Sequence, residues 1–378
     1  MGIGSSTTNT TCKAESIVQD LRGKHYVVTG ANTGLGYVTS RELAKMGAKV
    51  TLACRSSTRG QEALDRLRQE ALAKPVQEGV PLQEGLEDVD VQVEILDLGS
   101  LQSVIAFAQR FKATGMKVDV LVNNAGIMAI PERRETVDGL EMQIGVNHFG
   151  GHLLTRLMED MISDGGRVIF LSSVAHDQPP SMPKTTLDWD NINYEKPDTY
   201  VPWVAYGRSK LANVFDAKVF ATLLASRKIN TYAVHPGIVN TELTRNMTDS
   251  SFLSRMTRLL SPIAHLMFLS PLTGALTTLR CAVDPTLGAA EFTGKYWGDM
   301  KEEEPSELAL DPANPPRYWA ITEEMLEAKL GKKERRTLSN AVGGNPDLPK
   351  NAGKVAVSAL ELSGCYNQLL DNVILWRI

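Results

Sequence analysis

The chain has 378 residues, of which 43% are hydrophobic, so it is long enough for one large α/β domain with a well-filled core. Its formal net charge is −4 and its Lys and Arg residues are dispersed, which argues against a nucleic-acid partner. The 4 cysteines lie far apart and form no Cys-x-x-Cys pair. This spacing argues against a zinc or disulfide framework and favours a reducing compartment, so no metal is expected.

The first 20 residues are polar, and we expect a flexible tail there. Gly2 and Ser6 match the pattern for N-myristoylation, and Cys12 is available for a second acyl chain. An ordinary Ser/Thr-rich tail is the alternative. With no long apolar run and no signal peptide, the expectation is a cytoplasmic protein without a transmembrane segment, with acylation as its possible route to peripheral membrane contact.

A predicted strand, turn and helix unit begins the domain near Leu21. The β-branched run at 26–29 enters a glycine-rich turn, and helix-forming residues follow as far as Gly47. Such a turn points backbone N–H groups and a positive helix end at a phosphate, so it predicts a dinucleotide site. The predicted contacts from this turn are Thr29, Gly30, Asn32, Thr33, Gly34, Leu35 and Gly36.

The end of the next predicted strand, 48–55, indicates which dinucleotide is bound. NAD-selective enzymes place a carboxylate there for the ribose 2′-hydroxyl, whereas this chain has Arg55. A guanidinium at this point would pair with a 2′-phosphate, which favours NADP(H); an exposed Arg without a ligand is the alternative. We expect the segment 74–88, with its Pro, Gly and acidic residues, to be a surface insertion.

Three further strands are predicted at 91–96, 118–122 and 167–173. Ligands bind at the carboxyl ends of such strands, where Asp97 and Leu98 follow the first and Asn124, Ala125 and Gly126 follow the second. Asp97 either accepts a hydrogen bond from the adenine amine or caps the following helix.

Tyr206 and Lys210 are four residues apart, so on a helix they project from one face. A free tyrosine has a pKa near 10 and is a poor base at neutral pH, but a nearby cation stabilises the phenolate. This spacing alone is common on helix surfaces. Here the spacing is informative because it occurs in chain order with four other features, namely the glycine turn, Asn147, Ser173 and Pro236-Gly237.

This ordered set resembles the classical short-chain dehydrogenase/reductase family over residues 22–330. The resemblance implies a Rossmann doubly wound parallel sheet in a single α/β domain. It implies that Tyr206 is the general acid/base, that Ser173 binds the substrate carbonyl and that Lys210 lowers the tyrosine pKa and holds the nicotinamide ribose. Asn147 would position a water in the proton relay. The remaining implied cofactor contacts are Pro236, Gly237, Val239 and Thr241.

Within that family the chain is most similar to retinol dehydrogenases and the WW-domain-containing oxidoreductase. The stretches that carry this similarity are 52–55, 145–148, 206–213 and 234–237. An apolar carbonyl or alcohol substrate is implied, and the Leu-, Met- and Phe-rich segment 252–271 lies where the family builds a mobile substrate cover. Leu259, Leu260, Leu266, Met267 and Phe268 are the expected entrance.

The expected domains are therefore a tail at 1–20, an NADP-binding domain at 21–330, and a linker with an amphipathic tail at 331–378. The predicted function is NADP(H)-dependent interconversion of an alcohol and a carbonyl, in a chain that could form a homo-oligomer. Two alternatives remain, namely a regulatory or scaffolding NADP(H)-binding protein and a protochlorophyllide reductase-like enzyme. The intact catalytic set argues against the first, and the lack of a plastid transit peptide argues against the second.

Overall fold

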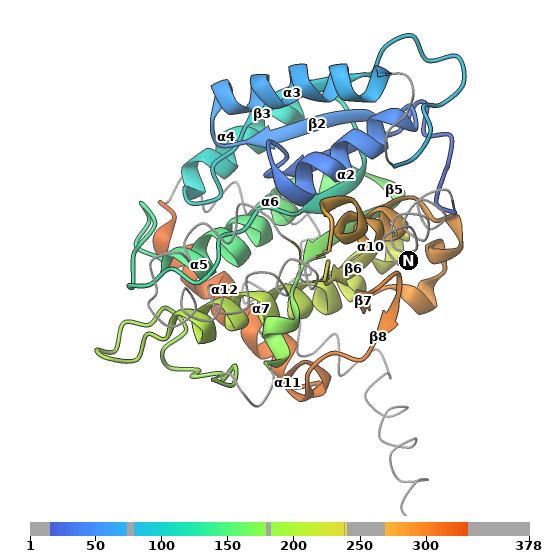
Figure 1. Cartoon of the computed structure of the whole chain (residues 1–378). Helices are drawn as coiled ribbons and strands as arrows, with labels where there is room; N and C mark the ends of the chain where they lie inside the picture. The colour runs from blue at the N-terminus through green and yellow to red at the C-terminus, as the bar shows by residue number, and fades with distance from the viewer. Residues whose placement is uncertain (1–15, 74–78, 179–182, 238, 240–268, 332–378) are drawn as a thin grey trace, which may run out of the picture.

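The structure is a computed structural model that describes residues 16–73, 79–178, 183–237, 239 and 269–331. In these ranges eight strands form one sheet in the order β3-β2-β1-β4-β5-β6-β7-β8 (Figure 1). All neighbours pair in parallel except β8, which runs antiparallel to β7. The strands are β1 (His25–Thr29), β2 (Lys49–Cys54), β3 (Val91–Ile95), β4 (Val118–Asn123), β5 (Ile162–Leu171), β6 (Asn230–Val234), β7 (Lys295–Gly298) and β8 (Lys301–Glu303).

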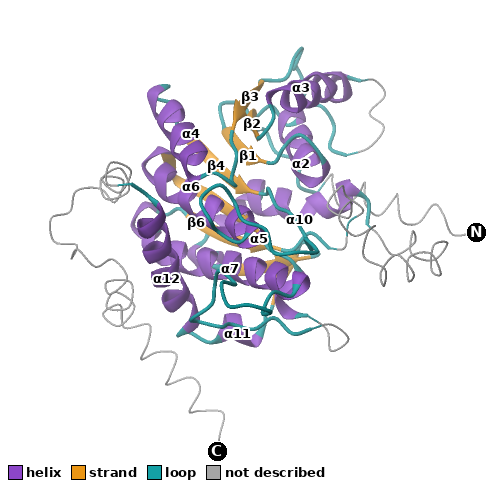
Figure 2. Ribbon diagram, turned by 90° about the vertical axis from the view of Figure 1, so that its left-hand side faces the viewer, coloured by secondary structure: helices purple, strands orange, loops and turns teal. Residues whose placement is uncertain are grey.

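Helices cover both faces of the sheet (Figure 2). The helices on one face are α2 (Gly34–Lys45), α3 (Ser57–Leu72) and α10 (Pro271–Val283). The other face carries α4 (Leu101–Ala113), α6 (Gly150–Met158), α7 (Pro202–Leu223) and α12 (Asn314–Lys329), with the short α5 (Met142–Ile144) and α11 (Glu307–Leu310) beside them. Each face has its own apolar core, as expected for a sheet whose strands are buried on both sides.

Local sequence explains where several helices begin. Ser56, Ser100 and Ser270 cap α3, α4 and α10, and each side chain accepts a hydrogen bond from a backbone N–H of the first turn. Pro271 occupies the first turn of α10, where no N–H partner is needed. Short side chains and proline therefore set these boundaries.

The Rossmann fold class is confirmed, and strands occupy all the positions predicted for them. The described part of the segment 74–88 lies at the surface from 81 to 88, and Val80 anchors it, because its side chain is fully buried and its N–H donates to Glu42 Oε2 at 2.7 Å. Ile17 is also buried, so packing begins within the stretch expected to be a tail. None of the helices in the described ranges is long and apolar enough to cross a membrane.

Candidate active site

A cleft of about 350 Å³ lies at the carboxyl ends of β1, β4 and β5. Chain order reverses between β1 and β4, which is where dinucleotides bind in doubly wound sheets. Most predicted cofactor contacts line this one cleft: Thr29, Gly30, Asn32, Thr33, Gly34, Leu35, Gly36, Arg55, Asp97, Leu98, Asn124, Ala125, Gly126, Tyr206, Lys210 and Pro236.

The glycine turn has the backbone that its sequence demands. Gly30 and Gly34 have φ of 65° and 57°, which side-chain-bearing residues rarely adopt. A Cβ at Gly36 would lie 2.4 Å from Asn124 Nδ2. Thr33 caps α2 without a side-chain hydrogen bond. The positive end of α2 is thereby left for an anion.

Thr29 and Asn124 join β1 to β4 at the floor of the cleft. Asn124 Nδ2 donates to the Thr29 carbonyl oxygen at 2.7 Å, and the Asn124 and Ala125 N–H groups donate to Thr29 Oγ1 at 3.0 and 2.9 Å. The Asn-Asn-Ala-Gly stretch is thus held against the glycine turn. These hydrogen bonds form a rigid floor on which a cofactor would lie, as the two strand ends predict.

The adenosine end of the cleft contains a second guanidinium that the sequence analysis missed. Arg59, in the first turn of α3, lines the cleft together with Arg55, and both side chains are exposed. Its position four residues after Arg55 was the available signal. Asp97 is not a helix cap, since Ser100 caps α4 and Asp97 Oδ1 accepts from the Gly99 N–H at 2.9 Å.

Tyr206 and Lys210 project from α7 into the other end of the cleft, as their spacing predicts. The Lys210 ammonium lies 5.7 Å from the centre of the Tyr206 ring. Burial raises the pKa of Tyr206 to about 12, against an opposing hydrogen bond with the Ser173 side chain, and burial lowers the pKa of Lys210 to about 8. Burial therefore sets the direction of the Tyr206 pKa, opposite to the lowering that the lysine spacing predicts.

Asn147 lies in a π-helical turn, Gly145–Phe149, that leads into α6. Its Oδ1 accepts from the Ile127 N–H at 2.8 Å, while its Nδ2 donates to the Ile127 carbonyl oxygen and to Ser209 Oγ, both at 2.9 Å. Such turns are frequent at functional sites. The side chain is fully engaged with protein, so it fixes the backbone that borders Lys210.

Ser173 and the start of the 236–241 loop meet through His235. His235 Nδ1 accepts from the N–H groups of Val174 and Gly237 at 3.3 and 3.4 Å, which fixes the strand ends of β5 and β6 together. Val239 is buried, at 9% exposure. Thr241 and the five apolar residues of the expected entrance lie outside the described residues, as do Gly2, Cys12 and the C-terminal amphipathic segment.

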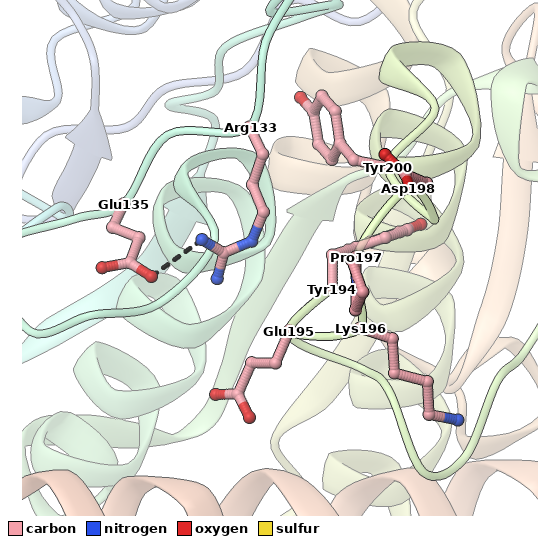
Figure 3. Close-up of a pocket in the computed structure, with 8 residues that line it drawn as sticks. All are labelled: Arg133, Glu135, Tyr194, Glu195, Lys196, Pro197, Asp198 and Tyr200. Carbon is pink, nitrogen blue, oxygen red and sulfur yellow. Dashed lines mark hydrogen bonds and ion pairs between the residues drawn. The ribbon is translucent and has the colours of Figure 1, made fainter.

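Apolar side chains that were not predicted complete the cleft: Ile127, Met128, Met142 and Val146. A separate pocket of about 570 Å³ lies between Arg133 and Glu135 and the loop 194–200 (Figure 3). Its side chains are mainly charged or phenolic, and Arg133 pairs with Glu135 at 2.8 Å. It contains none of the predicted catalytic groups, so we place the active site in the cleft at the carboxyl ends of the strands.

The fold and the cleft together define a dinucleotide-binding α/β protein, and comparisons with known proteins identify its family. The family model described as short chain dehydrogenase matches residues 24–183. The chain is 37% identical over 306 residues to mouse retinol dehydrogenase 12, covering 80% of this chain and 86% of that one. It is 36% identical over 308 residues to mouse retinol dehydrogenase 14, with coverage of 81% and 86%.

A crystal structure of an uncharacterized protein from Mycobacterium paratuberculosis matches with a TM-score of 0.60 and 30% identity, over 83% of this chain and 97% of that one. This chain belongs to the short-chain dehydrogenase/reductase family, and among its curated relatives are retinol dehydrogenases. It is accordingly an oxidoreductase of alcohols and carbonyls that uses a nicotinamide cofactor.

Proposed function

We propose that this chain is an NADP(H)-dependent reductase of apolar aldehydes or ketones. The observation that carries the cofactor choice is the pair Arg55 and Arg59 at the adenosine end of the cleft, with no acidic side chain among the cleft's residues at that end other than Asp97. Two guanidiniums suit a 2′-phosphate, which they can bind through several charge-assisted hydrogen bonds. The ribose of NAD would find no carboxylate after β2.

The apolar substrate class rests on the side chains around the catalytic end. Met128, which follows the Asn-Asn-Ala-Gly stretch, and Met142 line the cleft itself. Val174, directly after Ser173, and Leu269 are 42% and 39% exposed. The Trp203 ring meets the Tyr206 ring edge-on, with centroids 6.1 Å apart. An apolar substrate would bury this surface, with a favourable contribution of about 25 cal/mol per Å². The names of the retinol dehydrogenase relatives support the same class.

In the proposed reaction, bound NADPH would supply the hydride. Tyr206 donates its phenolic proton to the oxygen of the carbonyl as negative charge develops there, and Ser173 donates a second hydrogen bond to the same oxygen. Burial keeps the phenol protonated at neutral pH, as a general acid requires. Lys210 holds positive charge close to the phenol, and Asn147 fixes the backbone beside it.

The test is oxidation of NADPH, followed at its nicotinamide absorbance, against a panel of retinal, long-chain aldehydes, cyclic ketones and small polar carbonyls. We expect turnover with the apolar members, and Tyr206→Phe should lower kcat on the order of 10² to 10⁴-fold while NADPH still binds. Preference for the small polar carbonyls would contradict the substrate class. Tight NADPH binding without turnover of any member would instead favour a regulatory binding protein.

A further inference from the structure

A buried cluster of ionisable side chains lies behind the active site, where α6, α7 and α12 pack together. It consists of His148 in the π-helical turn before α6, His152 on α6, Asp216 on α7, and Thr322 and Glu323 on α12. The side chains of His148, His152 and Asp216 are at most 3% exposed. None of them takes part in the proposed reaction.

The hydrogen bonds of Thr322 determine which nitrogen of His148 carries a proton. Thr322 Oγ1 donates its single proton to the Tyr318 carbonyl oxygen at 2.9 Å. In this donor arrangement it accepts at its 3.0 Å contact with His148 Nε2, which makes Nε2 the protonated nitrogen. With Nε2 protonated, the neutral ring has its lone pair on Nδ1.

That lone pair faces another acceptor. His148 Nδ1 lies 3.2 Å from Asp216 Oδ2, and neither atom makes a hydrogen bond among the described residues. Two acceptors in contact inside a protein repel each other and lose their hydration, so the arrangement requires a cation between them. A second proton on His148 or a metal ion would satisfy it.

His152 is oriented so that its Nδ1 also faces the Asp216 carboxylate. Its Nε2 contacts Glu323 Oε1 at 2.7 Å, and its Nδ1 lies 2.9 Å from Asp216 Oδ1. In metal sites the ring nitrogen that does not bind the ion usually donates to a carboxylate, carbonyl or water, which aims the other nitrogen at the ion. Glu323 occupies this place for His152, and the Thr322 hydroxyl occupies it for His148.

We propose that His148 Nδ1, His152 Nδ1 and the Asp216 carboxylate form a binding site for a divalent transition-metal ion of the Zn²⁺ or Co²⁺ class. All three ligand atoms lie within 4.8 Å of one another. Bonds of about 2.0–2.1 Å at tetrahedral angles place neighbouring ligand atoms roughly 3.3 Å apart. His152 Nδ1 lies 2.9 Å from Asp216 Oδ1, and His148 Nδ1 lies 3.2 Å from the other carboxylate oxygen, Oδ2. Imidazole nitrogen and carboxylate oxygen are ordinary ligands for these ions.

Charge in the cluster is compatible with such an ion. Binding would release the Nδ1 proton of His152, so two neutral imidazoles and one carboxylate would hold the dication. Glu323 and Glu159 add two negative charges nearby. Arg156 adds one positive charge, and its guanidinium lies 3.2 Å from Glu323 and 2.6 Å from Glu159. The ion would tie α6, which follows Asn147, to α7, which carries Tyr206 and Lys210. Its role would therefore be structural.

The experiment measures metal content and cobalt spectra of the full-length protein. We expect about one equivalent of transition metal per chain after purification without chelator. After chelator treatment near the unfolding temperature, which opens the buried site, Co²⁺ should give visible absorption bands typical of nitrogen and oxygen ligands. It should give no sulfur-to-metal charge-transfer band, because no cysteine is a proposed ligand. Zn²⁺ should then raise the unfolding temperature, and chelator should lower it.

Variants separate this site from binding elsewhere. Asp216→Asn and His148→Gln should each weaken Co²⁺ binding at least about 100-fold. The matched control is His25→Gln, which replaces a buried histidine held by Thr51 and Lys117 and packed on Phe111 of α4, outside the cluster, and should bind metal normally. Less than about 0.1 equivalent of metal, no cobalt bands and no thermal response in the wild-type protein would overturn the proposal, and would assign the contact to a second proton on His148. Because this outcome needs no variant, a folding defect cannot obscure it.

Discussion

The Lys210 ammonium donates a 2.9 Å hydrogen bond to the carbonyl oxygen of Leu171, the last residue of β5. This bond ties the catalytic helix to the strand that leads directly into Ser173. It also holds a buried cation at the catalytic end of the cleft, and burial lowers its pKa to about 8. The lysine, and not the tyrosine with its pKa of about 12, is thus the first of the two groups to titrate as pH rises.

We therefore predict that the reductase activity declines above about pH 8, because Lys210 loses its charge there. A lysine with a lowered pKa is charged below that value and neutral above it. Lys210→Arg should move the decline to higher pH even if its rate is lower, since the guanidinium stays charged. The measurement is kcat/KM for NADPH-dependent reduction from pH 6 to 10. A decline at the same pH in both proteins would assign it to another group.

Arg55 and Arg59 should control the choice of cofactor. Replacing either with Gln removes a charge-assisted interaction worth about 1.5–3 kcal/mol, which corresponds to roughly 10- to 100-fold weaker NADPH binding. Binding of NADH should change little, because it lacks the 2′-phosphate. Calorimetric titration of both cofactors tests this, with Arg68, which is also on α3 but does not line the cleft, as the matched control in Arg68→Gln. Equal losses for NADPH and NADH would contradict the assignment.

Gly207 should tolerate no side chain, because the loop before α7 packs directly against it. A Cβ there would lie 2.1 Å from Thr185 Oγ1 and 2.4 Å from the Ala175 carbonyl oxygen. Gly207→Ala should lower the free energy of unfolding by about 1–3 kcal/mol. Gly288→Ala is the control, since a Cβ at that position meets nothing within 4 Å. Denaturant unfolding of both variants measures the difference, and equal stability would disprove the contact.

Acid should destabilise the fold partly through His235. Burial lowers the pKa of His235 to about 4. In the unfolded chain this histidine becomes protonated near pH 6.5, whereas in the folded chain it stays neutral until about pH 4. The free energy of unfolding therefore falls as pH drops from 6.5 towards 4. Over this whole pH range, His235 should lower the free energy of unfolding by roughly 3 kcal/mol. His235→Asn keeps an acceptor for the Val174 and Gly237 N–H groups but cannot titrate, so its unfolding free energy should vary less over this range. An unchanged pH slope would rule out His235 as a contributor.

The fold and most of the cleft could be predicted from the sequence because they depend on local patterns. The glycine turn, Asn-Asn-Ala-Gly and Tyr206 with Lys210 each combine a chain conformation with a chemical group, and parallel strands bring their ends to one edge. Arg59 and the apolar residues of the cleft were missed although they lie within a few residues of motifs, because the sequence does not show which neighbouring side chains face the cleft. Whether such a residue lines the cleft depends on which turns of a helix or loop face this edge of the sheet.

The buried cluster around Asp216 was out of reach for a related reason. His148 and His152 are four residues apart in the sequence, in the π-helical turn and in α6, but their partners come from α7 and α12, up to 174 residues away in the case of Thr322. Likewise, the pKa of Tyr206 depends on burial, and its lysine neighbour indicated the opposite direction. Long-range packing decides both features.

Both margins of the sheet bear charge. At one margin Glu94 of β3 pairs with Arg110, and at the other β8 carries Lys301 and Glu303, while Glu302 pairs with Lys295 of β7. Charged margins discourage strand addition from a neighbouring molecule, because the added strand would bury them. Self-association of this protein should consequently proceed through its helical surfaces, and a continuous sheet running from one copy into the next is disfavoured, which also lowers its tendency to form fibrils.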